Sequence, residues 1–144
     1  IGAMIDGKSD LGICFVGDGS FQLNIQELAT IKEYCLNIVI VLLNNKRLGI
    51  VSQFQLMNWE IDHSTGGKEN PDFSEIAKAY GLNSLKVRNI DDLKKITAKD
   101  ITKENLPLLV ECDIDQAEDI LPMLMGGQQL NQMYPFNDKI LLKK

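Results

Sequence analysis

The stretch that decides the fold is Leu11-Gly12-Ile13-Cys14-Phe15-Val16-Gly17-Asp18-Gly19, a short apolar run that stops at a Gly-Asp-Gly turn. A continuous apolar run of this length predicts a strand buried on both faces of a sheet. Apolar residues recur at helical spacing over residues 24–34, which predicts an amphipathic helix. The next run, residues 38–43, is rich in β-branched residues and ends at Asn44-Asn45, so it predicts a second strand. These segments together predict a strand-helix-strand unit.

The rest of the chain repeats this alternation. The expected elements are a helix within residues 48–57, a long polar loop at 59–71, a helix at 73–80 ended by Gly81, a strand at 82–87, a helix at 91–101 and a strand at 108–112. Alternating strands and helices predict an α/β fold, a doubly wound and mainly parallel sheet with helices on both faces. After residue 115 the pattern weakens, and we interpret residues 116–144 as a C-terminal tail or lid.

Composition limits the classes of protein to consider. The chain has 144 residues and 44% hydrophobic content, which suits one globular domain with a core of its own. The formal net charge is -5 and the Lys and Arg residues are dispersed, so nothing predicts binding to nucleic acid or to an acidic membrane. No apolar run approaches the ~20 residues that span a bilayer, and no signal peptide opens the sequence. We therefore expect a cytoplasmic protein.

The cysteines and the first residues add two expectations. Cys14, Cys35 and Cys112 are odd in number and lack Cys-x-x-Cys spacing, which argues against a disulfide framework and against a zinc site. They are expected to pack in the interior. Residues 1–6 have the pattern of the end of a helix without an initiating Met, so we expect residues 1–144 to be a C-terminal fragment of a longer enzyme.

Asp18 and Asn45 come directly after the first two predicted strands. A right-handed crossover makes these strands parallel, so both residues are expected at the same edge of the sheet, where open α/β sheets bind ligands. Carboxylate and amide oxygens suit Mg²⁺ shared with phosphate groups. Gly17 and Gly19 let the backbone turn sharply beside a ligand, and the following helix offers unpaired N–H groups to an anion. The sequence therefore predicts a site for a metal ion and a diphosphate.

The spacing resembles the motif of thiamine-diphosphate-dependent enzymes, since Gly17-Asp18-Gly19 is followed by twenty-four residues (20–43) and then by Asn44-Asn45. The flanking sequence is similar to the acetolactate synthase branch of that family over almost the whole chain. The stretches that carry this resemblance are 17–30 (GDGSFQLNIQELAT), 43–45 (LNN), 49–55 (GIVSQFQ), 71–73 (PDF), 77–81 (AKAYG), 121–123 (LPM) and 126–127 (GG).

The resemblance implies a set of ligands. Mg²⁺ would be bound by the side chains of Asp18 and Asn45 and by the backbone carbonyl of Arg47, whose side chain is expected to be incidental. The remaining residues implied to bind the cofactor, through backbone around the diphosphate, are Gly17, Gly19, Ser20, Leu48, Gly49 and Ile50. No catalytic residue is expected in this chain, because the family carries its activating Glu on a separate pyrimidine-binding domain, usually of another subunit.

The activity that the resemblance implies is that of a transferase or lyase in branched-chain amino acid biosynthesis. A 2-oxo acid such as pyruvate would lose CO₂ on the cofactor, and its two-carbon unit would be ligated to a second carbonyl compound. The expected partner is the pyrimidine-binding domain of another subunit in a homo-oligomer, so the isolated chain is expected to be inactive. The acceptor substrate, FAD in a middle domain of the enzyme and a regulatory subunit all stay open.

Departures from the family pattern concern the substrate. Acetolactate synthases usually read Gln-Trp-Gln where this chain reads Gln53-Phe54-Gln55, and the aromatic and basic residues typical of their next segment are replaced here by residues 56–62 (LMNWEID). Phe54 is a candidate for lining the substrate pocket, but an aromatic residue near a helix end also packs against neighbouring elements, and both interpretations stay open. His63, the only histidine, has no nucleophile or carboxylate pattern beside it and is expected to be a loop residue.

Other functions compete with this interpretation. Gly-Asp-Gly also occurs in haloacid-dehalogenase-like phosphatases, but these need an upstream Asp-x-Asp and a further acidic residue just after the motif, and the sequence has neither. The chain also fits another thiamine-diphosphate-dependent 2-oxo acid decarboxylase, or a non-catalytic module that binds a diphosphate. The presence of Asp18 and Asn45 favours retained metal binding in each of these thiamine cases.

Overall fold

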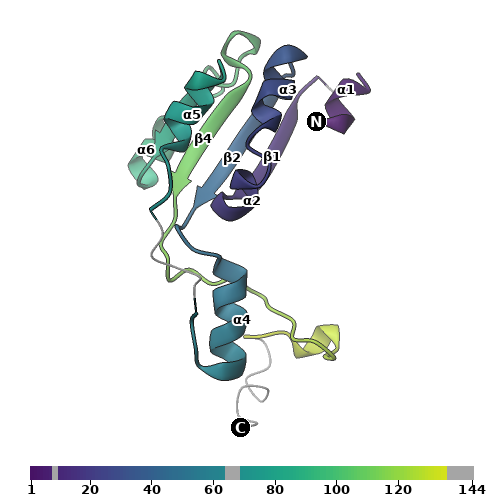
Figure 1. The fold of residues 1–144 in the computed structure, drawn as a ribbon, viewed down its shortest axis with the longest axis vertical. Helices are drawn as coiled ribbons and strands as arrows, with labels where there is room; N and C mark the ends of the chain where they lie inside the picture. Colours follow the sequence, from purple (N-terminus) through teal and green to yellow (C-terminus); the bar gives the residue numbers. More distant parts are fainter. Residues whose placement is uncertain (8–9, 64–68, 136–144) are drawn as a thin grey trace.

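A computed structural model describes residues 1–7, 10–63 and 69–135. Its centre is a four-stranded, all-parallel sheet in the order β1-β2-β4-β3 (Figure 1). The strands are β1 (Gly12–Gly17), β2 (Ile38–Asn44), β3 (Asn83–Val87) and β4 (Leu108–Asp113). The parallel α/β sheet predicted from the apolar runs is therefore confirmed.

Helices connect the strands. They are α1 (Gly2–Ile5), α2 (Asp18–Gln22), α3 (Glu27–Glu33), α4 (Gly49–Trp59), α5 (Phe73–Ala79) and α6 (Ile90–Lys95), with 3₁₀ turns η1 (Lys103–Asn105) and η2 (Leu130–Gln132). Helix α6 is shorter than the predicted 91–101. Asp100 Oδ2 accepts hydrogen bonds from the backbone N–H and the hydroxyl of Thr97, so a local turn replaces the expected helical turn.

One face of the sheet carries the larger hydrophobic core. Helices α2, α3 and α5 pack there, and Leu42, Phe73 and Leu109 are fully buried among them. Phe21 of α2 meets Phe73 edge to face, with ring centroids 5.5 Å apart. This packing fixes α2, which begins at Asp18, against the ends of β1 and β2.

The opposite face is covered over only part of the sheet. A second cluster of β2, β3 and β4 side chains packs there together with Ile96. On β1, Ile13 and Phe15 are 60% and 71% exposed. The prediction that this strand is buried on both faces is therefore wrong for the described part of the chain, where β1 is an edge strand that nothing covers on this side. Cys14 and Cys35 are also exposed, contrary to the interior packing predicted for them.

Helix α4 stands beyond the carboxyl ends of the strands rather than against a face of the sheet (Figure 1). Only Ser52 and Gln53 are buried in it, and several of its apolar side chains are exposed. The chain that leaves β4 passes beside α4, so the segments that follow β2 and β4 meet at this end of the molecule (Figure 1). Among the described helices, none is long and apolar enough to cross a membrane.

Candidate functional site

A hollow of about 540 Å³ lies at the carboxyl ends of β1 and β2. Strand β1 ends at Gly17, opposite Leu43 of β2, so the two connections that leave these strands start side by side. The nine residues for which the sequence predicts cofactor or metal contacts all line this hollow: Gly17, Asp18, Gly19, Ser20, Asn45, Arg47, Leu48, Gly49 and Ile50. The parallel crossover therefore brings both predicted loops to one place.

Two glycines sit in tight places at the hollow, Gly19 where the loop after β1 meets the loop after β2, and Gly49 against Asn45 within the loop after β2. A Cβ atom added to Gly19 would lie 2.7 Å from Cδ2 of Leu48, and one added to Gly49 would lie 2.8 Å from Nδ2 of Asn45. Any other residue at these positions would force the facing side chain to move. The glycines thus allow the backbone itself to come close to a ligand, as a diphosphate cradle requires.

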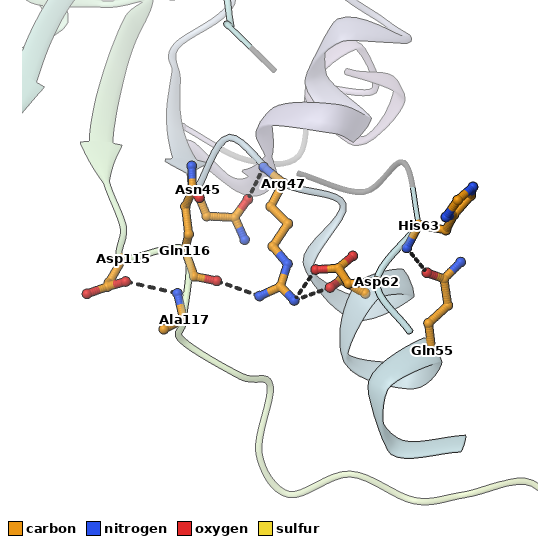
Figure 2. A network of polar contacts seen from close by, with 9 residues as sticks. Asn45, Arg47, Gln55, Asp62, His63, Asp115, Gln116 and Ala117 are labelled. Atoms are coloured by element: carbon orange, nitrogen blue, oxygen red, sulfur yellow. Dashed lines mark hydrogen bonds and ion pairs between the residues drawn. The ribbon is translucent and has the colours of Figure 1, made fainter. Parts of the chain in front are cut away.

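Asp18 and Asn45 supply the side-chain oxygens of the site. Asp18 is buried at the start of α2, and its Oδ2 accepts a hydrogen bond of 2.5 Å from Asn70. Asn45 Oδ1 accepts a bond of 3.1 Å from the backbone N–H of Arg47, which closes a tight turn (Figure 2). No group of three or more His, Cys, Asp or Glu side chains could hold a metal ion among the described residues. One carboxylate and one amide fit Mg²⁺ that also takes backbone and phosphate oxygens.

The side chain of Arg47, expected to be incidental to metal binding, has structural contacts of its own. It is 11% exposed and donates hydrogen bonds to the backbone carbonyl of Gln116 (2.7 Å) and to Oδ2 of Asp62 (2.9 Å) (Figure 2). It also contacts the hydroxyl of Ser52. The guanidinium therefore joins the loop after β2 to α4, to the segment after α4 and to the segment after β4.

The segment after β4 forms one wall of the hollow, through Ile114, Glu118, Asp119 and Ile120. The side chain of Gln53, on α4, bonds to the backbone of this segment. Gln53 Nε2 donates to the carbonyl of Ile120 (3.1 Å), and the N–H of Ile120 donates to Gln53 Oε1 (3.0 Å). The predicted tail or lid at 116–144 thus starts beside the site, while residues 136–144 lie outside the described residues and its role as a lid stays a prediction.

Two other residues singled out in the sequence lie away from this hollow. Phe54 is exposed and packs edge to face against Trp59, with ring centroids 5.6 Å apart, and it is not among the residues that line the hollow. Of the two interpretations of Phe54, the structure therefore shows packing against a neighbouring side chain. His63 is exposed in the loop after α4, as predicted, and its backbone N–H donates to Gln55 Oε1 (2.8 Å) (Figure 2).

A buried polar network beside the hollow is absent from the sequence-based predictions. Asn44 and Glu111 are both buried, and Asn44 Nδ2 donates to Glu111 Oε1 (2.9 Å). Asn70 links this pair to Asp18. The one signal in the sequence is Glu111 itself, a charged residue inside an apolar run, because a carboxylate is seldom buried without partners.

An ion pair lies next to this network. Lys86 Nζ and Asp72 Oδ2 are 2.7 Å apart. The hydrogen bond from Lys86 lowers the pKa of Asp72 below 3.8, and the same bond, with a smaller contribution from Glu111, raises the pKa of Lys86 above 10.5. Burial raises the pKa of the Cys112 thiol, which favours its protonated, less reactive form.

The fold and the hollow define a cofactor-binding domain of a known class. Residues 1–112 match the family described as thiamine pyrophosphate enzyme, C-terminal TPP binding domain, and the chain belongs to this family. Within it, the chain is 39% identical to the acetolactate synthase large subunit of Cyanidium caldarium over 135 residues, which are 92% of this chain and 23% of that protein. It is 34% identical to the acetolactate synthase isozyme 2 large subunit of Escherichia coli K12 over 134 residues, 92% of this chain and 24% of that protein. The chain is therefore an acetolactate-synthase-like thiamine-diphosphate-binding domain, as the resemblance predicts.

Solved structures agree with this assignment. The thiamine diphosphate-dependent 4-hydroxybenzoylformate decarboxylase of Rhodococcus jostii RHA1 superposes with a TM-score of 0.68 at 25% identity, covering 81% of this chain and 22% of that chain. Benzoylformate decarboxylase from Polynucleobacter necessarius gives a TM-score of 0.68 at 25% identity, covering 83% and 22%. The chain thus spans only about a quarter of the curated relatives that it matches, 23% and 24% of the two named above.

Proposed function

We propose that this chain binds the diphosphate of thiamine diphosphate through Mg²⁺. In this proposal the side chains of Asp18 and Asn45 and the backbone carbonyl of Arg47 bind the ion, and the backbone of the two glycine-bearing loops binds the diphosphate. The observation that carries the proposal is that all nine predicted contact residues line one hollow at the carboxyl edge of β1 and β2. Open α/β sheets bind their ligands at this edge.

Bound thiamine diphosphate supplies the carbanion chemistry of 2-oxo acid decarboxylation. The residues of this chain bind the ion and the diphosphate and orient the cofactor. The carboxylate of Asp18 offers negative charge to the ion, and Gly19 and Gly49 let the backbone N–H groups approach the phosphate oxygens. The wall that contains Ile114 and Ile120 places apolar side chains at the hollow. We assign no catalytic residue to this chain.

For the whole protein we propose the reaction named in its curated relatives. A pyruvate-like 2-oxo acid would be decarboxylated and its two-carbon unit ligated to a second carbonyl compound, in cytoplasmic branched-chain amino acid biosynthesis. The activating Glu would come from the pyrimidine-binding domain of another subunit in a homo-oligomer, and FAD and a regulatory subunit are open features of that assembly. The relatives' name and 92% coverage of this chain support this proposal.

A second candidate is a 2-oxo acid decarboxylase that releases an aldehyde. It is favoured by the two solved decarboxylase structures and by Phe54, which stands where acetolactate synthases usually have Trp. Product analysis separates the two. The natural polypeptide that carries this chain should convert pyruvate to acetolactate in the first case and to acetaldehyde in the second. Cofactor binding without turnover of any 2-oxo acid would identify a non-catalytic diphosphate-binding module.

The metal site is tested by Asp18→Ala. We expect Mg²⁺-dependent binding of thiamine diphosphate to weaken by about 2 to 4 kcal/mol, roughly 30- to 1,000-fold, because the ion loses its one side-chain carboxylate. The melting temperature of the metal-free protein should fall only modestly, because the buried Asp18 carboxylate gives up one hydrogen bond, and its donor Asn70 is only half-buried and can bond to water instead. Calorimetric titration of the cofactor, with Mg²⁺ and with a chelator, measures the first effect, and thermal melts measure the second.

Two further variants sharpen this test. Asn45→Ala should act in the same direction, and the double variant should cost less than the sum because both residues serve one ion. Asp91→Ala removes an exposed aspartate on α6 and should leave cofactor binding unchanged. An Asp18→Ala protein that binds the cofactor as tightly as the unmodified one, with the same Mg²⁺ dependence, would show that the metal assignment is wrong.

A further inference from the structure

The side chain of Asn70 makes three hydrogen bonds around Asp18, to α2 and to β2. Its amide nitrogen Nδ2 donates to Asp18 Oδ2 at 2.5 Å and to Asn44 Oδ1 at 2.8 Å. Its amide oxygen Oδ1 accepts a bond of 3.1 Å from Gln22 Nε2. An amide nitrogen carries two hydrogen atoms, so both are used. Asn70 therefore makes a directed contact with the end of β2 and with both ends of α2.

Only one orientation of the Asn70 amide satisfies these partners. If its oxygen and nitrogen were exchanged, the oxygen would face the carboxylate of Asp18 and the carbonyl oxygen of Asn44, and the nitrogen would face the amide nitrogen of Gln22. All three contacts would then be repulsive, because they would pair acceptor with acceptor or donor with donor. The position thus requires a side chain with donors on one side and an acceptor on the other, which Asn provides.

The network is anchored deep in the sheet. Asn44 donates through Nδ2 to Oε1 of Glu111, and both residues are buried. The second oxygen of Glu111, Oε2, is buried and has no hydrogen-bond partner among the described residues. A carboxylate oxygen only accepts, so Glu111 selects the nitrogen end of the Asn44 amide, and the amide oxygen of Asn44 is left facing Asn70. The orientation of Asn70 is therefore set by the strands rather than by the loop that carries it.

We propose that Asn70 is a positioning residue for Asp18, an inference that rests on the proposed function. By donating to Oδ2, Asn70 fixes the rotation of the carboxylate before any ion arrives and leaves Oδ1 for the cation. In the described part of the chain, Asn70 is the only side chain that donates a hydrogen bond to Asp18. Outer partners that orient metal ligands typically contribute about 10- to 100-fold to metal affinity.

The effect should appear in metal binding rather than in folding. Asn70 is only half-buried, and a second hollow of about 180 Å³, lined by Asp18, Gln22 and Asn70, gives water access to the groups that it would leave behind. Water can then take over the lost hydrogen bonds but does not fix the carboxylate in one rotation. The loss of Asn70 should therefore raise the Mg²⁺ requirement while the fold stays intact.

The experiment uses the natural polypeptide that carries this chain, stripped of metal. Binding of thiamine diphosphate is measured by calorimetry at a series of Mg²⁺ concentrations. For Asn70→Ala we expect the half-saturating Mg²⁺ concentration to rise about 10-fold or more, with cofactor affinity at saturating Mg²⁺ and the melting temperature of the metal-free protein nearly unchanged. Gln22→Ala, which removes one bond that orients Asn70, should give a smaller rise in the same direction.

Asn83→Ala is the matched control, because it also removes an Asn side chain whose amide donates to a distant segment, here to the carbonyl of Asn105 at 2.9 Å, at the opposite end of the sheet. It should leave the Mg²⁺ dependence unchanged. The inference is overturned if neither Asn70→Ala nor Gln22→Ala shifts the Mg²⁺ requirement, or if Asn83→Ala shifts it equally. An unmodified protein that fails to bind thiamine diphosphate in the presence of Mg²⁺ would instead overturn the proposed function itself.

Discussion

Arg47 lies where three segments of the chain meet, and its charge is largely removed from water. Such a cation is stable only with hydrogen-bond partners, and here they are the carboxylate of Asp62, the carbonyl of Gln116 and the hydroxyl of Ser52. Because the carbonyl partner belongs to the segment after β4, the side chain of Arg47 fixes one wall of the hollow from the opposite loop. Breaking such a contact costs more than the bond contributes, since polar groups are left unpaired.

We predict that Arg47→Met lowers the free energy of unfolding by about 1 to 3 kcal/mol, because Met keeps much of the apolar stem but cannot donate. The backbone amides of residues 114–120 should exchange hydrogen faster, since Gln116 loses its partner. Denaturant unfolding and hydrogen exchange measure these effects. Arg88→Met, at an exposed position just after β3, should show neither change. Unaltered exchange over 114–120 in the Arg47 variant would contradict this account of the wall.

At the scale of elements, the start of α5 depends on Asp72, whose two oxygens have different partners. Oδ1 accepts a bond of 3.0 Å from the backbone N–H of Glu75 and caps the helix, and Oδ2 pairs with Lys86 of β3 at 2.7 Å. The cap fixes where α5 begins, and the ion pair fixes that start against the sheet. Because Asn70 lies two residues earlier, the same contacts hold the loop that carries it.

We predict that Asp72→Asn removes the ion pair but keeps the cap, since Asn caps helices about as well as Asp. The loss should be at most about 1 kcal/mol, because both partners are partly exposed and screened by solvent. The pKa of Asp72 is lowered, so its stabilisation is present above pH 3.8 and is lost as pH falls through the lowered value. The pKa of Lys86 is raised, so its share is present below pH 10.5 and is lost as pH rises through the raised value.

Urea unfolding across this pH range measures the difference between the two proteins, which should vanish at both extremes. Asp72→Ala serves as the comparison. It should cost about 1 kcal/mol more than Asp72→Asn, because it also removes the cap. This additional cost should not depend on pH in the neutral range. A difference between the unmodified protein and Asp72→Asn that persists at low pH would show that the charge of Asp72 is not what stabilises α5.

The elements themselves were open to prediction because each has a local pattern. The run 38–43 is apolar, rich in β-branched residues and stops at a polar pair, and the observed strand β2 includes the whole of it. The contacts around the site have no such pattern. Asn70 lies 52 residues from Asp18 and 26 from Asn44, and Arg47 lies 69 from Gln116. The fold and the two loops of the site therefore followed from sequence, whereas the side chains that position them depend on which loops the topology brings together.

At the scale of the molecule, the bare face beside β1 is the main departure from the sequence-based expectation. An apolar run indicates that a surface is to be covered but carries no information about what covers it. Ile13 and Phe15 are adjacent on this face, and Leu11 is also exposed. Contiguous exposed apolar surface of this kind is a site of association in proteins.

We predict that the 144-residue chain, produced alone, binds a hydrophobic dye such as ANS and self-associates. Ile13→Thr with Phe15→Thr should reduce both effects with little loss of stability, because these side chains are already exposed and Thr suits a strand. Dye fluorescence and sedimentation measure this. Ile90→Thr, at a site 61% exposed on α6, should leave both properties unchanged. Equal self-association of the double variant and the unmodified chain would show that another surface, and not this face of β1, causes the association.

Gln53 contacts the main chain of Ile120 and not its side chain. Every amino acid except proline offers the same N–H and C=O groups, so this attachment imposes almost no requirement on which residue occupies position 120. Glu118 and Asp119 line the hollow from the same segment. They can therefore be replaced during evolution without breaking the bonds between Gln53 and this segment. The backbone bonds that attach this segment and the side chains that line the hollow can therefore change independently. Related proteins with the same scaffold are free to present different chemistry to the hollow.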